Sequence, residues 1–151
     1  HGAKIIYAYC ECSAPKISVV TRKAIGGSYV ALGSRQMGAD VTLAWPTAQI
    51  AVMGPEGAAP LVNGRQIREA ADQDAERQRF IEEYRKRFFN PYRAADIGQI
   101  DEVIEPRETR FQLAQALDLL RTKVVSVVPK KHGLFPVRGD QSWRISHGAW
   151  R

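Results

Sequence analysis

The residues of this chain best suited to chemistry are Gly26, Gly27 and Ser28, which follow a strand-like run and precede an apolar segment of helical character. A glycine pair at the start of a helix leaves backbone N–H groups uncovered by side chains. The first turn of a helix also carries partial positive charge. Together these properties suit a site for an oxygen that becomes negative, such as an enolate or ureido oxyanion. The alternative is a simple tight turn after a strand.

Other kinds of catalytic site are not supported by the sequence. The glycines lack the G-x-G-x-x-G spacing of a dinucleotide site, and no Gly-Lys-Ser or Gly-Lys-Thr closes a phosphate loop. No G-x-S-x-G elbow is present. Ser28 has no internal histidine to activate it, because the histidines are His1, His132 and His147, at or near the chain ends. None of them is spaced with cysteines or carboxylates as a metal site needs, so no metal is expected.

Two further groups are predicted to be structural. Asp101 and Glu102 are adjacent and therefore point apart, which makes them a poor pair for acid–base catalysis. Trp45 lies between a predicted strand and a proline, where an indole ring packs more often than it stacks on a ligand.

The segments around the glycines predict alternating strands and short helices. Apolar residues at three- and four-residue spacing predict a helix over residues 2–14, which Pro15 ends. Strands are expected at 17–20, 41–45 and 50–53, and short helices at 27–33 and 55–62. The basic residues after the first strand are interpreted as a turn. The order strand, strand, helix is typical of stacked ββα units, although no repeat is visible in the sequence itself.

Residues 66–89 are a different kind of segment, densely charged and without glycine or proline. Their apolar side chains form a narrow stripe that ends in aromatic residues. One interpretation is an amphipathic helix that packs on its own domain. The other is an arm that packs on a second subunit, which the narrow stripe favours slightly.

Beyond residues 66–89, a short helix at 91–95 and a short strand at 103–104 are expected. Pro106 and Glu108 predict the start of a helix whose core face is Phe111, Leu113, Ala116, Leu117 and Leu120.

Composition and charge limit the classes of function. A chain of 151 residues with 44% hydrophobic residues is long enough for one domain, and no apolar run approaches the ~20 residues of a membrane span. Cys10 and Cys12, two apart on one predicted helix, point away from each other, so neither a disulfide nor a shared metal is expected, and semi-buried thiols fit a reducing cytoplasm. The whole net charge of +6 lies within residues 121–151. A basic tail is weaker support for nucleic-acid binding than a basic domain surface, so nucleic acid is an unlikely partner.

Several strings, in order along the chain, resemble a known family. They include H-G-A-K at 1–4, A-W-P-T at 44–47, A-V-M-G at 51–54, N-P-Y at 90–92, I-D-E-V-I-E-P at 100–106 and P-K-K-H-G at 129–133. The series resembles the C-terminal part of the carboxyltransferase (beta) subunit of biotin-dependent acyl-CoA carboxylases, in the propionyl-CoA and methylmalonyl-CoA branch. The resemblance covers residues 1–136. Residues 137–151 match nothing in the family and are expected to be a basic tail, altered or non-native.

The resemblance implies an α/β, crotonase-like fold, a superhelix of ββα units, here as a partial domain with a projecting helical arm. It implies that Gly27 and Ser28 supply a backbone oxyanion hole toward biotin, with Gly26 beside it in the substrate pocket. Tyr29 and Val30 match the wall of the acyl pocket. Propionyl-type relatives often have Asp where this chain has Val30, which leaves the acyl chain length open and would suit a longer or different acyl group.

The partners implied are acyl-CoA, a biotin carboxylase and biotin carrier subunit with biotin attached to the carrier, and further copies of the chain in a homo-oligomer. The location implied is the cytoplasm, or the mitochondrial matrix in a eukaryote. Because the family's subunit is much longer, the isolated chain is expected to be an inactive fragment. Two alternatives stay open: the same component of a biotin-dependent decarboxylase, which runs the transfer in reverse, and a non-catalytic remnant that acts as an assembly domain.

Overall fold

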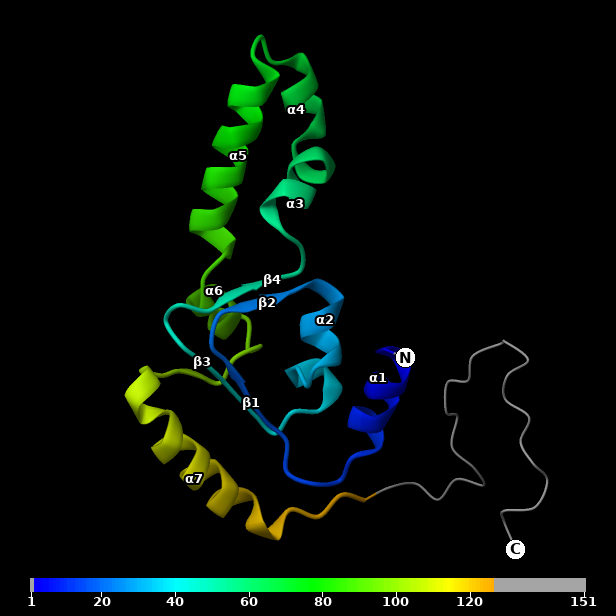
Figure 1. Cartoon of the computed structure of the whole chain (residues 1–151), viewed down its shortest axis with the longest axis vertical. Helices are drawn as coiled ribbons and strands as arrows, with labels where there is room; N and C mark the ends of the chain where they lie inside the picture. The colour runs from blue at the N-terminus through cyan, green and yellow to red at the C-terminus, as the bar shows by residue number, and fades with distance from the viewer. Residues whose placement is uncertain (1, 127–151) are drawn as a thin grey trace, which may run out of the picture.

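The computed structural model describes residues 2–126, which contain two successive ββα units; their strands and the first helix lie in the body of the protein, and the second helix begins the projecting arm (Figure 1). The first unit consists of β1 (Ile17–Val20), β2 (Lys23–Ile25) and α2 (Gly26–Ala31). The second consists of β3 (Val41–Ala44), β4 (Gln49–Ala51) and α3 (Pro55–Val62). Each strand of the first unit pairs in parallel with its counterpart in the second. The repeated order predicted from the sequence is therefore present.

The strands form two small parallel sheets. β1, β3 and β5 (Glu102–Val103) make a three-stranded sheet in the order β1-β3-β5, and β2 with β4 makes the second. Between them lies a core built largely of alanine, consisting of Ala24, Ala44, Ala48, Ile50, Ala94 and Ile100. Small side chains let the two sheets and α6 (Pro91–Asp96), which contributes Ala94, approach closely.

The connection between β1 and β2 is fixed to the matching connection of the second unit. The main-chain carbonyls of Val20 and Arg22 accept hydrogen bonds from the N–H groups of Trp45 (2.9 Å) and Gln49 (2.6 Å). The carbonyl of Thr21, between them, accepts one from the Thr47 hydroxyl at 3.1 Å. The sequence predicted only a basic turn here, and β2 was missed because just one of its three side chains, Ala24, is buried.

Helix α1 (Gly2–Glu11) ends earlier than the predicted residue 14 and packs on α2. Lys16, at the start of β1, ties α1 to the short 3₁₀ helix η1 (Arg35–Met37), because its ammonium donates to the Tyr9 carbonyl at 2.8 Å and to the Met37 carbonyl at 3.3 Å. Cys10 and Cys12 are free and exposed, so the prediction of semi-buried thiols was wrong.

The projecting arm consists of three helices rather than one (Figure 1). α3 is followed by α4 (Gly64–Glu69) and α5 (Gln73–Phe88), and α5 packs against both. The single helix predicted over 66–89 is therefore wrong: the chain turns at residues 70–72, and the Asp72 carboxylate caps α5 by accepting the Ala75 N–H at 2.9 Å. Ile81 is only 4% exposed, so part of the apolar stripe packs within the arm itself.

Helix α7 (Thr109–Leu119) follows a 3₁₀ turn, η2 (Pro106–Glu108), close to the start predicted from Pro106. Its N-terminus is held to β3 because the Trp45 indole N–H donates to the Thr109 hydroxyl at 2.9 Å. The predicted core face is only partly correct. Ala116 is buried, but Phe111 is 62% exposed and Leu117 is 54% exposed.

Some predictions concern residues that the structure does not describe. The histidines His1, His132 and His147 and the predicted tail at 137–151 belong to the part of the chain that is not described. Among residues 2–126, no helix combines the length and apolar character needed to cross a bilayer. The same residues contain no group of three His, Cys, Asp or Glu side chains placed to hold a metal.

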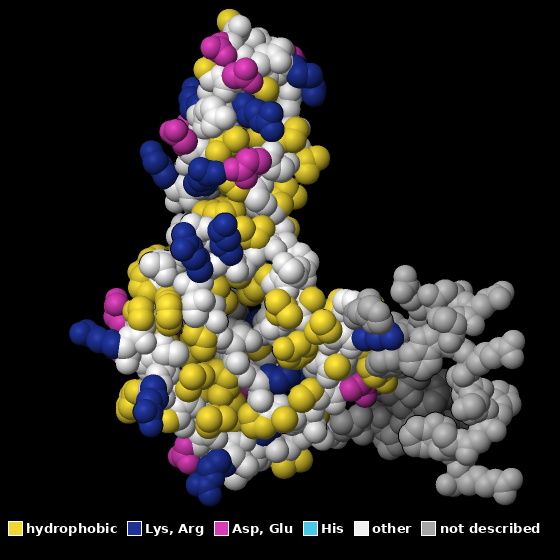
Figure 2. Space-filling view, in the orientation of Figure 1, with side chains coloured by type: hydrophobic (Ala, Val, Ile, Leu, Met, Phe, Trp, Pro, Cys, Tyr) yellow, Lys and Arg dark blue, Asp and Glu magenta, His cyan; other side chains and the backbone are white. Residues whose placement is uncertain are grey.

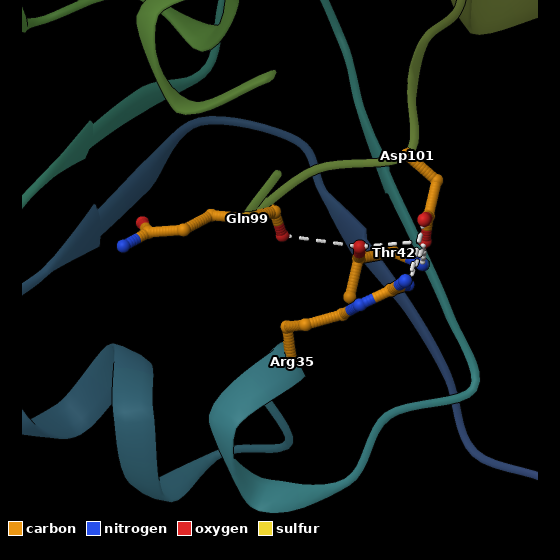
Figure 3. A network of polar contacts seen from close by, with 4 residues as sticks. All are labelled: Arg35, Thr42, Gln99 and Asp101. Carbon is orange, nitrogen blue, oxygen red and sulfur yellow. Dashed lines mark hydrogen bonds and ion pairs between the residues drawn. The ribbon is translucent and has the colours of Figure 1, made fainter. Parts of the chain in front are cut away.

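Asp101 joins the start of β5 to β3 and η1 (Figure 3). Its carboxylate accepts the Thr42 N–H at 2.8 Å and the Thr42 hydroxyl at 2.9 Å, and the Arg35 guanidinium donates to both carboxylate oxygens at 2.6 Å. The Gln99 carbonyl lies 3.1 Å from the same Thr42 hydroxyl and competes with the carboxylate for its single proton. Thr42 is only 2% exposed, so its N–H group depends on this carboxylate for a partner.

Replacing this carboxylate should destabilise the fold. Asp101→Ala leaves a buried N–H without its acceptor, and we expect the free energy of unfolding to fall by about 2 kcal/mol. The matched control is Glu102→Ala, because Glu102 is adjacent and also exposed, but its carboxylate has no hydrogen bond or ion pair among the described residues. Urea denaturation of both variants measures the difference. Equal losses for the two variants would show that the Asp101 network contributes nothing specific.

Candidate functional site

The glycine pair lies where the sequence placed it, at the start of a helix that follows a strand directly. β2 ends at Ile25, which is extended (φ −124°, ψ 131°), and α2 begins at Gly26 with no side-chain cap. The first N–H groups of an α-helix have no partner within the helix. Gly27 and Ser28 are both exposed, so this turn is open to the surface.

The two glycines have different structural roles. Gly26 has φ of +68°, in the left-handed region that favours glycine, and a Cβ there would lie 3.4 Å from the Val52 carbonyl oxygen. Gly27 has no positive φ, and a Cβ built on it would meet nothing within 4 Å. The backbone therefore requires glycine only at position 26. At position 27 the space beside the helix is open, which leaves room for a ligand group to approach the N–H groups.

The Ser28 side chain is turned back onto the chain. Its hydroxyl donates to the Ile25 carbonyl at 3.1 Å. This contact occupies the hydroxyl proton and leaves the side chain without a base, which agrees with a role for the Ser28 backbone rather than for its oxygen as a nucleophile.

Tyr29 and Val30, predicted to line the acyl pocket, point to different environments. The Tyr29 ring packs against the alanine-rich core, and its hydroxyl is buried without a hydrogen-bond partner among the described residues. Burial raises the pKa of Tyr29 above its ordinary value. Val30 is 38% exposed on the outer side of α2.

A cleft of about 630 Å³ lies between α1, β1, β2 and α2. Of the five residues predicted for the site, Ser28 and Tyr29 line this cleft, whereas Gly26, Gly27 and Val30 do not. Sequence reasoning missed the cationic residues of the cleft, Lys16, Arg22 and Lys23. The basic turn at the last two was the available signal, but it was interpreted only as a connection.

Asp40 joins the segment between α1 and β1 to the segment after α7. Its carboxylate accepts the Lys16 N–H and the Lys123 ammonium, both at 2.7 Å, and the same ammonium donates to the Ala14 carbonyl at 3.1 Å. Burial by itself raises the pKa of Asp40, but the hydrogen bonds and charges of Lys123 and Lys16 outweigh it and leave this pKa below its usual range.

A second cavity of about 420 Å³ lies where the arm meets the β2-β4 sheet. It is bordered by the ion pair between the Arg85 guanidinium and the Glu56 carboxylate, at 2.5 Å. The pKa of Glu56 is lowered, first by a hydrogen bond from its own N–H group and then by Arg85. Both side chains are more than half exposed, so the ion pair positions the base of the arm more than it stabilises it.

Comparison with known proteins places the chain in a family. A model described as the carboxyl transferase domain matches residues 1–135. The chain belongs to the carboxyl transferase family. It is 51% identical over 137 residues to the propionyl-CoA carboxylase carboxyltransferase subunit of Haloferax mediterranei, covering 91% of this chain and 27% of that protein. It is 48% identical over 137 residues to the methylmalonyl-CoA decarboxylase subunit alpha of Propionigenium modestum, covering 91% and 26%.

A solved structure gives the same result for the fold. The transcarboxylase 12S hexamer, with methylmalonyl-CoA and methylmalonic acid bound, superposes with a TM-score of 0.86 at 52% identity, covering 91% of this chain and 26% of that one. The predicted α/β, crotonase-like fold of ββα units, present here as a partial domain, is thereby confirmed. The chain spans about a quarter of the length of these carboxyl transferase relatives.

The different roles of the two glycines can be measured. Gly26→Ala should lower the free energy of unfolding by about 1–2 kcal/mol, because alanine is strained in the left-handed region. Gly27→Ala should raise it by roughly 0.5–1 kcal/mol, because alanine is the better helix former and meets no neighbour. Thermal or urea unfolding of the two variants tests this. Destabilisation by Gly27→Ala of the same size would mean that position 27 is also conformationally constrained.

Proposed function

We propose that this chain is the biotin-facing part of a carboxyltransferase, which moves a carboxyl group between carboxybiotin and an acyl-CoA of the propionyl-CoA type. The observation that carries the proposal is the glycine-led start of α2, with Gly27 and Ser28 exposed and open space beside Gly27. Membership of the carboxyl transferase family supports it. So do relatives named for propionyl-CoA and methylmalonyl-CoA chemistry.

In this proposal the chain acts through its main chain. Biotin, attached to a carrier domain of a partner subunit, supplies the carboxyl group and the base that removes the substrate proton. The N–H groups of Gly27 and Ser28 hold the ureido oxygen of biotin as negative charge develops on it. Because they are fixed at the start of a helix, they need no rearrangement during the reaction. Loss of one donor from such a site costs about 3 kcal/mol of transition-state stabilisation.

The remaining partners follow from the same role. The groups that hold the CoA part of the substrate would come from outside this chain, which spans only about a quarter of its relatives. Tyr29 would then support the site from behind, since its hydroxyl is buried in the core. Val30, apolar and partly exposed, would meet the alkyl part of the acyl group. We place the assembled enzyme, with its biotin carboxylase and carrier partners, in the cytoplasm.

Two other functions have support. The identity to a methylmalonyl-CoA decarboxylase subunit favours a decarboxylase component as the second candidate, with the same donors acting in the reverse direction. The arm favours an assembly domain without catalysis of its own. The isolated chain is expected to show no turnover under any of the three.

Biocytin, a soluble form of carrier-linked biotin, tests the site directly. In an amide-shift titration of the 151-residue chain, we expect the Gly27 and Ser28 signals to move selectively and saturably. Gly27→Pro removes one N–H and should abolish the movement, whereas Gly27→Ala keeps the N–H and should preserve it. A well-dispersed spectrum in which neither signal moves would refute the biotin-side assignment and favour the assembly domain.

The arm is the surface that we propose for contact with a second copy. At the end of α3, Leu61 is 74% exposed and Val62 is 68% exposed, although their helix packs on α5. Replacing both by Asp should reduce the mass of the assembly measured by light scattering, because exposed apolar side chains at an interface would become charged. Arg65→Asp, on the neighbouring α4 with an exposed side chain, is the control. An unchanged mass for the double variant would exclude this surface as the interface.

A further inference from the structure

The second cavity, where the arm meets the β2-β4 sheet, has a floor and a roof from different parts of the fold (Figure 1). Its floor is made by Lys23, Ile25 and Gln49. The next residues along the two strands, Ala24 and Ile50, are buried in the core. Successive side chains of a strand point to opposite faces, so the floor is the outer face of the sheet. The roof is the base of the arm, at the start of α3 and the end of α5.

Two hydrogen-bond donors lie side by side on this floor. Lys23 of β2 is paired directly with Gln49 of β4 in the parallel register. Neighbouring strands are about 4.8 Å apart, and paired residues present their side chains on the same face. An ammonium and an amide at this spacing can each donate one hydrogen bond to the two oxygens of a single carboxylate.

Neither donor is used within the described part of the chain. The Lys23 ammonium has no ion pair or hydrogen bond there, and the half-buried side-chain amide of Gln49 has no hydrogen bond there either. A polar group that is withdrawn from bulk water normally finds a partner in the protein, in ordered water or in a ligand. These two groups are therefore free to hold a ligand that reaches the floor.

The charges of the cavity favour an anion with a single negative charge. The charged side chains of its lining are Lys23, Arg85 and Glu56. The Arg85 guanidinium already donates to the Glu56 carboxylate at 2.5 Å, so these two charges compensate each other. Lys23 is left as the uncompensated cation, and it attracts an anion. A second negative charge on the ligand would find no cation of its own and would be repelled by Glu56.

The apolar part of the lining suits a flat ring. Ile25 lies two residues beyond Lys23 on the same face of β2, and Pro55 and Phe89 lie opposite it on the arm. The Phe89 ring is held from within the arm by a tilted contact with Tyr84, with ring centroids 6.2 Å apart. On the face drawn in Figure 2, Lys and Arg side chains lie beside hydrophobic ones where the arm meets the body. A volume of about 420 Å³ is within the range of small-molecule sites.

We propose that this cavity binds an aromatic monocarboxylate, with its carboxylate on Lys23 and Gln49 and its ring between Ile25 and Phe89. The ligand bridges the sheet and the arm, because its hydrogen-bond donors come from the sheet and its ring contact comes from the arm. The site is independent of the proposed carboxyltransferase role, since neither Gly27 nor Ser28 lines this cavity.

Naphthalene-2-carboxylate is the probe, titrated into the 151-residue chain at low salt while the amide signals of the floor residues and of Phe89 are followed. We expect saturable shifts on the floor and at Phe89 together, which weaken as sodium chloride screens the exposed charge. Lys23→Met should weaken binding about tenfold, and Gln49→Leu about fivefold, through loss of one donor each. Cyclohexanecarboxylate, which has the charge without the aromatic ring, should bind about fivefold more weakly.

Two variants distinguish this site from general attraction. Arg22→Gln removes the adjacent exposed cation, which lines only the cleft beside α2, and should leave binding unchanged. Glu56→Gln removes the carboxylate and frees the Arg85 guanidinium, so it should strengthen binding several-fold. Equal losses for Arg22→Gln and Lys23→Met would reduce the effect to net charge and overturn the proposal.

Binding to exposed apolar surface in general is the other alternative. Phe111 and Leu119 of α7 are 62% and 76% exposed and lie outside the cavity. Shifts at these two residues as large as the shift at Phe89 would overturn the proposal, and so would shifts confined to the floor. Biocytin shifts at Gly27 and Ser28 without any binding of the aromatic carboxylate would overturn this site alone and leave the proposed function in place.

Discussion

The structure depends on the parallel registry of two successive ββα units. β1 on β3 and β2 on β4 fix the second unit under the first, residue by residue, from Ile17 opposite Val41 to Ile25 opposite Ala51. The close spacing of the sheets is possible because the side chains between them are mainly alanines. Larger core side chains would push the layers apart and shift the point at which β2 passes into α2. The position of the glycine-led turn is therefore a consequence of the registry.

The registry also explains how the proposed site could act through main-chain groups. A side chain has to be ordered by its neighbours, whereas an N–H at the start of α2 is fixed as soon as β2 is paired. Gly26 makes the turn possible because it adopts a positive φ. Gly27 leaves the N–H groups of the turn accessible because no neighbour lies beside it. The same pairing holds the connection that carries Arg22 and Lys23, so the turn and the cleft both owe their geometry to backbone hydrogen bonds between the two units.

Much of the fold was predictable where the local signals agreed. The β-branched run at Ile17–Val20 and the helix from Pro55 to Val62 were predicted with the observed bounds. β2 was not, because a strand with one buried side chain in three has no readable periodicity. The turn in the arm contains neither glycine nor proline. The only local signal was Asp72 as a helix cap. The two residues before it, Ala70 and Ala71, favour helix, so little in the sequence indicated a break.

Parts of the candidate site could also be predicted from the sequence, and other parts could not. The place of Gly27 and Ser28 at the start of a helix could be predicted because its signal is local: a glycine pair after a strand. The role of Asp101 could not, because its partner Thr42 is 59 residues away and only the pairing of β3 with β5 brings them together. The cationic cleft also needed the fold, since Lys16 and Arg22 border one space only after the chain bends between β1 and β2.

On the side of the first unit, the two sheets end in β1 and β2. β1 is the outer strand of its sheet and β2 has a single neighbour, β4. Each therefore has one row of backbone N–H and C=O groups that no described strand satisfies. Such an edge is a template on which another strand can be laid in parallel, so the superhelix can be extended on the side of the first unit. A covalently linked neighbouring unit on that edge would extend the ββα stack. A separate copy of the chain on the same edge would begin an aggregate instead.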